Sequence, residues 1–494
     1  MKVVFMHIFK VIFLAGATLF AAGVVGAEAD QGPTVMARAA DVDAAAAMLR
    51  DQALNKNVAY AWLTQLTTRF GARMAGSASE RKAAEWAAGS LESMGFDTIK
   101  IEPFDLQLWQ RGAESAEILS PFPQKLVVTA LGGSRATPPE GVDAEATLFA
   151  TYQEFLDSKV DLKGRIVVVL QPTARTQTGV GYGLNSGSVR SRGPLEAKQR
   201  GASAFLMRAL GTETHRFAHA GATQFQTKEG IPSLAMSPPD AEAMLRMKVL
   251  QDKGEAGPLR IKIVSTPRFL GGGQSQNVIA EFRGTEKPDE IITIGGHLDS
   301  WDLGTGAIDD GSGMAITLAA VKTMIDAGKR PRRTIRVVLY GAEEVSQPDN
   351  KGLSGAQAYA DRHVNPATRV ASETHILTAE SDFGADVIYA ASMPVASQTD
   401  FNARLGKILY PLKVYVDPKP ADGGGPDTLP SQRQGVPAMD LRQNGMDYFD
   451  THHTADDVLE RIEPAKLDQN VAAWTATLWL VANGDVTFNP QVRK

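Results

Sequence analysis

The spacing of apolar residues along the chain predicts helices and strands that follow one another in turn. Residues 42–70 and 79–94 carry apolar side chains at helical intervals, and Gly95 after the second of these predicts a C-cap. Residues 312–327 predict a third helix with a wide buried face. Short β-branched or apolar runs predict strands at 98–101, 278–282, 291–294, 334–340 and 375–377. Helices that alternate with strands are typical of an α/β fold.

The pattern of predicted elements changes between residues 115 and 265, where many short strands and loops replace the helix–strand alternation. We expect this stretch to be an inserted domain, with residues 41–114 and 266–494 forming the domain that it interrupts. Residues 173–192 within it are rich in Gly, Ser, Thr and Arg and predict a mobile loop.

The first residues have the pattern of an export signal. Lys2 and Lys10 are the only charged residues before Glu28, and the apolar run 11–25 ends in Val25-Gly26-Ala27. This pattern predicts that residues 1–27 are a signal peptide cleaved after Ala27, and that the mature protein is periplasmic or secreted. An uncleaved membrane anchor is the alternative, although the apolar run is short for a bilayer span.

The composition of the chain limits the kinds of binding surface and metal site that it can form. The 494 residues have a formal net charge of −5 without a basic block, which argues against a nucleic-acid surface, and no later stretch is apolar enough to cross a membrane. The chain contains no cysteine. A metal site must therefore be built from His, Asp and Glu, a donor set that suits zinc, with manganese or cobalt as substitutes.

The segment from Gly296 to Gly313 concentrates acidic side chains around one histidine, directly after the strand predicted at 291–294. Carboxylates this close repel one another unless a cation lies among them. We expect His297 to be a metal ligand. Asp299, two residues on, can accept a hydrogen bond that fixes the imidazole tautomer. Asp309, at the start of the next helix, can bridge two metals with its two oxygens.

Further candidate ligands follow other predicted strands. Glu343 and Glu344 come after the strand at 334–340, and being adjacent they diverge, so one can bind metal while the other acts as general base. Asp382 and His453 can complete the ligand set. Since ligands of open α/β sheets bind at the carboxyl ends of strands, these residues should meet at one edge. The combination predicts metal-assisted hydrolysis.

These motifs resemble the di-zinc aminopeptidase and glutamate carboxypeptidase family of metallopeptidases. The resemblance rests on Gly296-His297-Leu298-Asp299-Ser300-Trp301-Asp302, Asp309-Asp310-Gly311-Ser312-Gly313, Ala342-Glu343-Glu344, Glu380-Ser381-Asp382 and His453-Thr454-Ala455-Asp456-Asp457. The first and fourth motifs look most like the carboxypeptidase Q branch. The resemblance implies a mixed central sheet flanked by helices, of the zinc-dependent exopeptidase (phosphorylase/hydrolase-like) type, with residues 115–265 as a β-rich protease-associated domain.

The resemblance also implies roles for individual residues. Glu343 is expected to be the general base, Asp299 to orient His297, and the Asp309–Asp310 peptide bond to be cis. His452 is expected to face the substrate, and we hypothesise that it donates a hydrogen bond to the oxyanion. The implied ligands of two zinc ions, with Asp309 bridging, are His297, Asp309, Glu344, Asp382 and His453.

We therefore predict an exported di-zinc exopeptidase whose partner is a short peptide; a homodimer is left open. The direction of trimming is open too, among aminopeptidase, carboxypeptidase and dipeptidase action. Candidate partners for a substrate carboxylate are Arg73, Arg433, Arg442 and Tyr448. Two alternatives share the implied fold. One is a glutaminyl cyclase-like acyltransferase with a single zinc, and the other is a non-catalytic receptor-like protein, which is expected to lack ligands.

Overall fold

The computed structural model describes residues 33–224, 230–371, 373–394 and 400–488. The chain divides into two compact units at the boundary between Asp41 and Val42. The first unit contributes only the start of helix α1 (Pro33–Asn55) to the described residues. The predicted signal peptide, residues 1–27, lies outside them. Everything below concerns the second unit, which begins at Val42.

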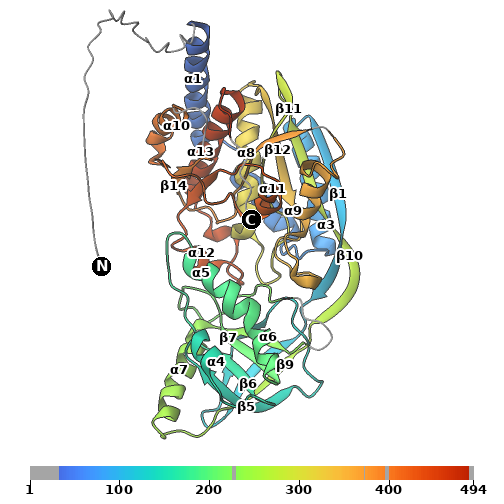
Figure 1. The fold of residues 1–494 in the computed structure, drawn as a ribbon, viewed down its shortest axis with the longest axis vertical. Helices are drawn as coiled ribbons and strands as arrows, with labels where there is room; N and C mark the ends of the chain where they lie inside the picture. Colours follow the sequence, from blue (N-terminus) through green and yellow to red (C-terminus); the bar gives the residue numbers. More distant parts are fainter. Residues whose placement is uncertain (1–32, 225–229, 372, 395–399, 489–494) are drawn as a thin grey trace, which may run out of the picture. The chain divides into compact units, whose positions relative to one another are not determined.

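A five-stranded mixed sheet forms the centre of this unit, in the order β1-β10-β12-β11-β13 (Figure 1). Strands β11, β12 and β13 run parallel, whereas β10 is antiparallel to both β12 and β1. Side chains alternate between the two faces, so Val337 and Leu339 enter one core while Val338 and Tyr340 enter another. The strands are β1 (Thr98–Gln110), β10 (Arg268–Phe282), β11 (Lys287–His297), β12 (Arg333–Tyr340) and β13 (Thr374–Glu380).

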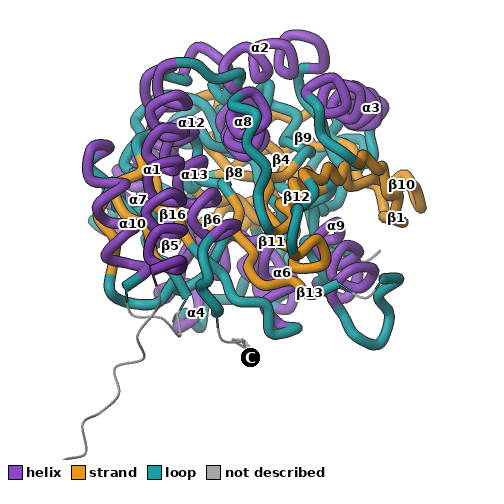
Figure 2. The backbone as a smooth tube through the Cα atoms, turned by 90° about the horizontal axis from the view of Figure 1, so that it is seen from above, coloured by secondary structure: helices purple, strands orange, loops and turns teal. Residues whose placement is uncertain are grey.

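Helices cover both faces of this sheet. Figure 2 shows α3 and α8 on one side of β10, β11 and β12, and α9 on the other. The buried faces of α8 and α13 (Pro464–Asn483) belong to the larger core. These arrangements confirm the predicted α/β fold with a mixed sheet flanked by helices. The other helices concerned are α2 (Ala59–Phe70), α3 (Ala78–Met94), α8 (Ser312–Asp326), α9 (Ser354–Tyr359) and α11 (Leu429–Arg433).

Residues 114–265 build a second sheet of eight strands, in the order β3-β2-β9-β5-β6-β7-β8-β4. The long antiparallel pair β1 and β10 leads into and out of it, ending with Gln110 opposite Arg268. We call residues 115–265 the insert. Its strands are β2 (Glu114–Ser120), β3 (Gln124–Leu126), β4 (Val128–Ala130), β5 (Val142–Phe149), β6 (Ile166–Val169), β7 (Ala204–Arg208), β8 (Ser233–Met236) and β9 (Arg260–Ser265), and its helices are α4 (Tyr152–Asp157), α5 (Val180–Asn185), α6 (Ser191–Gln199) and α7 (Pro238–Asp252).

One sequence prediction is wrong within the insert. Residues 173–192 were expected to form a mobile loop. Residues 173–179 do lie outside the helices and strands, but from Val180 on the expectation is wrong, because α5 and a helical turn at Ser186–Arg190 run into α6 without a break. Gly and Ser lower the intrinsic helix propensity of this stretch. Packing outweighs that preference, because Tyr182 stacks on Phe449 with 4.3 Å between ring centroids.

The C-terminal half also forms a small three-stranded sheet, in the order β15-β14-β16. It consists of β14 (Ile388–Ser392), β15 (Tyr415–Asp417) and β16 (Asp440–Gln443), and it is accompanied by α10 (Phe401–Leu409) and α12 (Tyr448–Thr451). None of the helices within the described ranges is both long and apolar enough to span a bilayer.

Candidate active site

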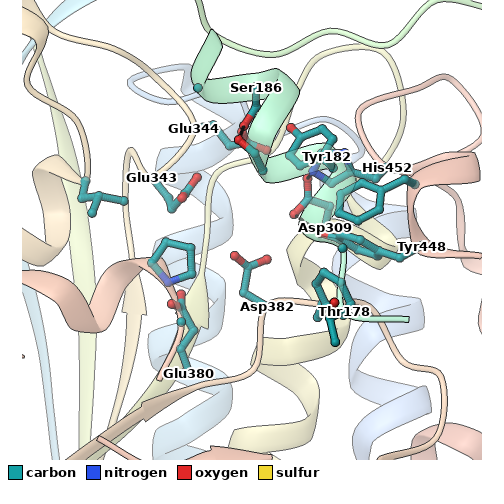
Figure 3. Close-up of a pocket in the computed structure, with 18 of the residues that line it drawn as sticks. Thr178, Tyr182, Ser186, Asp309, Glu343, Glu344, Glu380, Asp382, Tyr448 and His452 are labelled. Carbon is teal, nitrogen blue, oxygen red and sulfur yellow. Dashed lines mark hydrogen bonds and ion pairs between the residues drawn. The ribbon is translucent and has the colours of Figure 1, made fainter. Parts of the chain in front are cut away.

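The predicted ligands meet at the carboxyl ends of the three parallel strands, as α/β geometry requires. His297 is the last residue of β11, Glu343 and Glu344 follow β12, and Asp382 follows β13. Two further residues come from other elements: Asp309 lies in the turn before α8, and His453 follows α12. Figure 3 shows Asp309, Glu343, Glu344 and Asp382 gathered around one cavity.

Asp309 faces two groups of side chains with its two oxygens. Its Oδ1 lies 3.2 Å from Nε2 of His297, and its Oδ2 lies 3.0 Å from Nε2 of His453. Each histidine is paired with a second carboxylate, because Asp382 Oδ1 is 3.6 Å from His297 Nε2 and Glu344 Oε1 is 2.9 Å from His453 Nε2. The peptide bond between Asp309 and Asp310 is cis, as the resemblance implies.

The geometry fits metal ions better than hydrogen bonds. Glu344 Oε1 and Asp382 Oδ1 are buried acceptors that have no hydrogen-bond partner in the described part of the chain. The potential ligand atoms of His297, Asp309 and Asp382 all lie within 4.8 Å of one another. Asp309 Oδ1 is within hydrogen-bond distance of His297 Nε2, but unpartnered carboxylate oxygens that converge on the same imidazole nitrogens are the arrangement expected of a nitrogen- and oxygen-liganded metal.

Asp299 holds its neighbours through different atoms from those predicted. Nδ1 of His297 lies 2.9 Å from the main-chain oxygen of Asp299 and 3.8 Å from its Oδ1. The carboxylate instead accepts hydrogen bonds from the backbone N–H groups of Glu343, at 3.0 Å, and Glu344, at 3.3 Å. The main chain of Asp299 therefore orients the imidazole, while its side chain fixes the turn that presents the two glutamates.

His452 and His453 stack on each other, with 3.5 Å between ring centroids. Both approach Asp309 Oδ2, His452 Nε2 at 3.4 Å and His453 Nε2 at 3.0 Å, so Asp309 with the two histidines forms another group of potential ligands. His453 Nε2 also lies 2.9 Å from Glu344 Oε1, which favours His453 over His452 as a metal ligand. The N–H of Ala220, in the insert, also donates to the main-chain oxygen of His453 at 2.8 Å.

Burial and neighbouring charges set the protonation of the site. Burial tends to lower the pKa of His297, but the Asp309 and Asp382 carboxylates hold that pKa well above its usual value. Burial and His453 keep the pKa of His452 well below its usual value, which favours a neutral imidazole. Burial and the adjacent Glu344 raise the pKa of Glu343 well above normal.

A cavity of about 1100 Å³ opens over the ligands and is lined from both the central domain and the insert. The insert contributes Tyr182 and Arg190, which sequence reasoning missed because it treated their segment as a loop. Arg190 donates to the Tyr182 hydroxyl, while its Nε is buried without a partner in the described ranges. Arg175 ties the insert to α12 through ion pairs with Asp447 and Asp450.

The four side chains proposed from the sequence as partners of a substrate carboxylate differ in their positions and contacts. Arg73 is fully buried and its guanidinium donates to the main-chain oxygens of Leu298, Thr305 and Gly306, so its role is structural. Arg433 is exposed and does not line the cavity. Arg442 lines the cavity but is paired with Asp417. Tyr448 lines it as well, and its hydroxyl donates to Asp309 Oδ1 at 3.0 Å.

The fold and the ligand groups define a metal-dependent hydrolase of the α/β class. Residues 277–478 match the model of peptidase family M28. Carboxypeptidase Q from Bos taurus is 30% identical over 430 residues, covering 87% of this chain and 86% of the relative, and the human protein matches similarly. The chain belongs to peptidase family M28, and it is a metallopeptidase.

Solved structures agree with this assignment. The structure of a peptidase M28 precursor from Shewanella amazonensis is 40% identical, with a TM-score of 0.85, and the match covers 92% of this chain and all of that chain. A zinc aminopeptidase from Bacillus subtilis is 18% identical with a TM-score of 0.59, covering 88% of this chain and 97% of that one. The second likeness shows a shared fold.

Proposed function

We propose that this chain is an exported di-zinc exopeptidase that hydrolyses dipeptides and other short peptides. The observation that carries the proposal is the position of Asp309, whose two oxygens face two separate histidine–carboxylate pairs. A carboxylate in that position is suited to bridge two metal ions. The zinc aminopeptidase from Bacillus subtilis, which shares the fold, supports zinc as the metal.

The donor set supports the following assignment of ligands. One zinc ion would be held by His297 and Asp382, the other by Glu344 and His453, and both by Asp309. Bound zinc lowers the pKa of water to about 7 and polarises a carbonyl group. Trp301 keeps Glu344 in place, because its indole N–H donates to Oε2 and leaves Oε1 directed at His453.

Glu343 is the proposed general base. Its backbone N–H is fixed by the Asp299 carboxylate, and its side chain lines the cavity beside the ligand groups. From there the Glu343 carboxylate can take a proton from the attacking water and deliver it to the leaving amine. The neutral His452 imidazole and the Tyr448 hydroxyl also line the cavity, and His452 is the proposed donor to the oxyanion.

The shape of the cavity favours small substrates with free ends. The insert lines part of the cavity with Tyr182 and Arg190, and we propose that this wall favours a dipeptide or tripeptide over a long polypeptide. Arg190 lines the cavity, and we propose that its guanidinium binds the carboxylate at the C-terminal end of such a peptide. This arrangement, together with the likeness to carboxypeptidase Q, favours carboxypeptidase or dipeptidase action.

The remaining parts of the proposal concern the whole chain. Residues 41–114 and 266–494 form the catalytic domain, and residues 115–265 are proposed as a protease-associated domain, consistent with their separate sheet. The sequence pattern of residues 1–27 supports export and removal of a signal peptide. A short peptide is the expected partner, and a homodimer is left open.

Product analysis tests the proposal. Purified protein loaded with zinc should carry two zinc ions per chain by plasma emission spectroscopy. Mass spectrometry after incubation with a dipeptide and tripeptide library should show terminal residues released. Protein that carries its full zinc content and cleaves no peptide would exclude peptidase action, whereas one zinc per chain with cyclisation of glutaminyl peptides would support the acyltransferase alternative.

A further inference from the structure

Residues 211–223 of the insert, here called the insert loop, run along the segment that bears His453. The hydroxyl of Thr212 donates a hydrogen bond to Asp450 Oδ1 at 2.7 Å. Toward the other end of the insert loop, the backbone N–H of Ala220 donates to the main-chain oxygen of His453 at 2.8 Å. The insert loop therefore holds the chain both just before His453 and at His453 itself.

His453 depends on such contacts because its backbone is in an unfavourable conformation. Its φ of 62° lies in the left-handed region, which the Cβ atom of a residue other than glycine disfavours. Its Nδ1 lies 3.4 Å from the main-chain oxygen of Ala220, to which a proton on Nδ1 can be donated. That proton leaves Nε2 free for a metal ion, and a partner of this kind fixes the orientation of a metal-binding imidazole. Ala220 thus orients His453 through its main chain.

A buried pair of side chains fixes the insert loop beside Ala220. Nε2 of His219 lies within hydrogen-bond distance of Glu213 Oε1, at 2.9 Å, and both side chains are 2% exposed. The pair fills the space at Gly211, where a Cβ atom would lie 2.0 Å from His219 Nε2. Because His219 precedes Ala220 in the chain, the pair restrains the peptide group whose N–H binds His453.

The insert also holds Glu344, the other unshared ligand proposed for the same zinc ion. The hydroxyl of Ser346, two residues after Glu344, donates to the main-chain oxygen of Thr223 in the insert loop at 2.7 Å. Trp301, whose indole N–H donates to Glu344 Oε2, packs into the core of the insert's sheet. Since both unshared ligands have partners in the insert, we call the site of Glu344 and His453 the insert-held site.

The second site has ligands that are held by the central domain. Nδ1 of His297 lies 2.9 Å from the main-chain oxygen of Asp299, and Asp382 follows β13. Within the described ranges, no hydrogen bond or ion pair joins either ligand to the insert. We call this site of His297 and Asp382 the sheet-held site. The two sites therefore differ in their dependence on the insert.

We propose that the insert sets the zinc affinity of the insert-held site alone, through the insert loop. His219 and Glu213 are positioning residues, which act on the ligand His453 through the backbone of Ala220. This inference rests on the proposed di-zinc function. It implies that a weakened contact with the insert yields protein with one zinc ion, in the sheet-held site, rather than protein without metal.

Titration of zinc-loaded protein with a competing chelator measures both affinities. In His219→Leu, which cannot bond to Glu213, the affinity of the insert-held site should fall by about 10- to 100-fold, as is typical when a partner of a metal ligand is lost. His219→Gln keeps an N–H donor and should stay within about threefold of wild type. His363→Leu is the matched control, because His363 is another buried histidine, 3.0 Å from Glu102 Oε2, that does not line the cavity. It should keep both affinities.

Double variants show which zinc ion is lost. His219→Leu combined with His453→Gln should bind as much zinc as His453→Gln alone, because both changes act on the insert-held site. His219→Leu combined with Asp382→Asn should lose nearly all zinc at a chelator concentration that leaves one ion in Asp382→Asn.

The outcomes separate the two proposals. Wild type that binds fewer than two zinc ions contradicts the di-zinc function itself. Wild type with two ions, and His219→Leu with both affinities unchanged or lowered equally, overturns the role of the insert alone. An equal loss in His363→Leu also overturns that role, since the effect would then come from lower stability. If His219→Leu does not fold by circular dichroism, Ser346→Ala decides: it removes the hydrogen bond to Thr223 and should weaken the insert-held site only, and an unchanged affinity there overturns the inference.

Discussion

The indole N–H of Trp301 donates a hydrogen bond to Oε2 of Glu344 at 2.8 Å. This bond leaves Oε1 of Glu344 facing His453. Trp301 is anchored in turn by the insert, because it packs into the core of the eight-stranded sheet. Its ring fills the space beside Gly132, where a Cβ atom would lie 2.2 Å from the indole. A proposed metal ligand is thus oriented by a residue held in another sheet.

Trp301→Phe removes this N–H while keeping an aromatic ring in the core. We expect zinc affinity to fall by about 10- to 100-fold, as is typical when a partner of a metal ligand is lost. Titration with a competing chelator measures the change. Trp86→Phe, on α3, is the control, and equal affinity in both variants would contradict the role assigned to Trp301.

Glu343→Gln should keep both zinc ions and lose turnover by about 100- to 10,000-fold, because the amide cannot take a proton from water. Metal analysis and kcat on a dipeptide measure the two effects. Appreciable turnover in this variant would mean that another group is the base.

His452→Gln tests whether this histidine acts on the substrate or on the metal. We expect kcat to fall by about 100-fold, as after loss of one oxyanion donor, with zinc still at two per chain. A loss of bound zinc would instead identify His452 as a ligand, and His453→Gln provides the comparison.

Arg190→Met should weaken recognition of the substrate's C-terminal carboxylate. Because a charge-assisted hydrogen bond is lost, kcat/KM for a free dipeptide should fall by about 10- to 100-fold, while that for the C-terminal amide stays nearly constant. Equal losses on both substrates would show that Arg190 supports the insert helix rather than the substrate.

Glu80 predicts a pH dependence of stability. Burial, with a further contribution from Asp299, raises the pKa of Glu80 to about 8 from an ordinary value of 4.5. The folded state then binds a proton more tightly than the unfolded state, so the free energy of unfolding falls as pH rises from 4.5 to 8. In Glu80→Gln this decline should be weaker, and Glu92→Gln should leave it unchanged. Denaturant midpoints at pH 5.5 and pH 8.5 measure the difference.

Much of the site could be predicted from the sequence because several of its residues lie at the carboxyl ends of predicted strands. His297 ends one apolar strand, Glu343 and Asp382 follow two others, and the carboxyl ends of parallel strands share one edge. The helix at Val180–Asn185 was missed because tertiary stacking on Phe449, not local propensity, stabilises it.

Contacts between distant segments could not be predicted either. Trp301 reaches Glu344 across 43 positions of sequence, and the backbone of Asp427 reaches Glu380 across 47. No periodicity or local motif encodes such pairs. The hydrogen bond from His297 to the main chain of Asp299 was also hidden, since sequence reasoning considered only the side chain.

Two parts of the chain line the cavity: the central domain carries the proposed metal ligands, and the insert carries Tyr182 and Arg190. A compound that only chelates zinc would therefore inhibit every relative with the same ligand set. A compound that also contacts Tyr182 and Arg190 would bind a surface whose residues can differ between relatives that share the same metal ligands. Selective inhibitors of this enzyme should be built outward from the metals toward the insert helix.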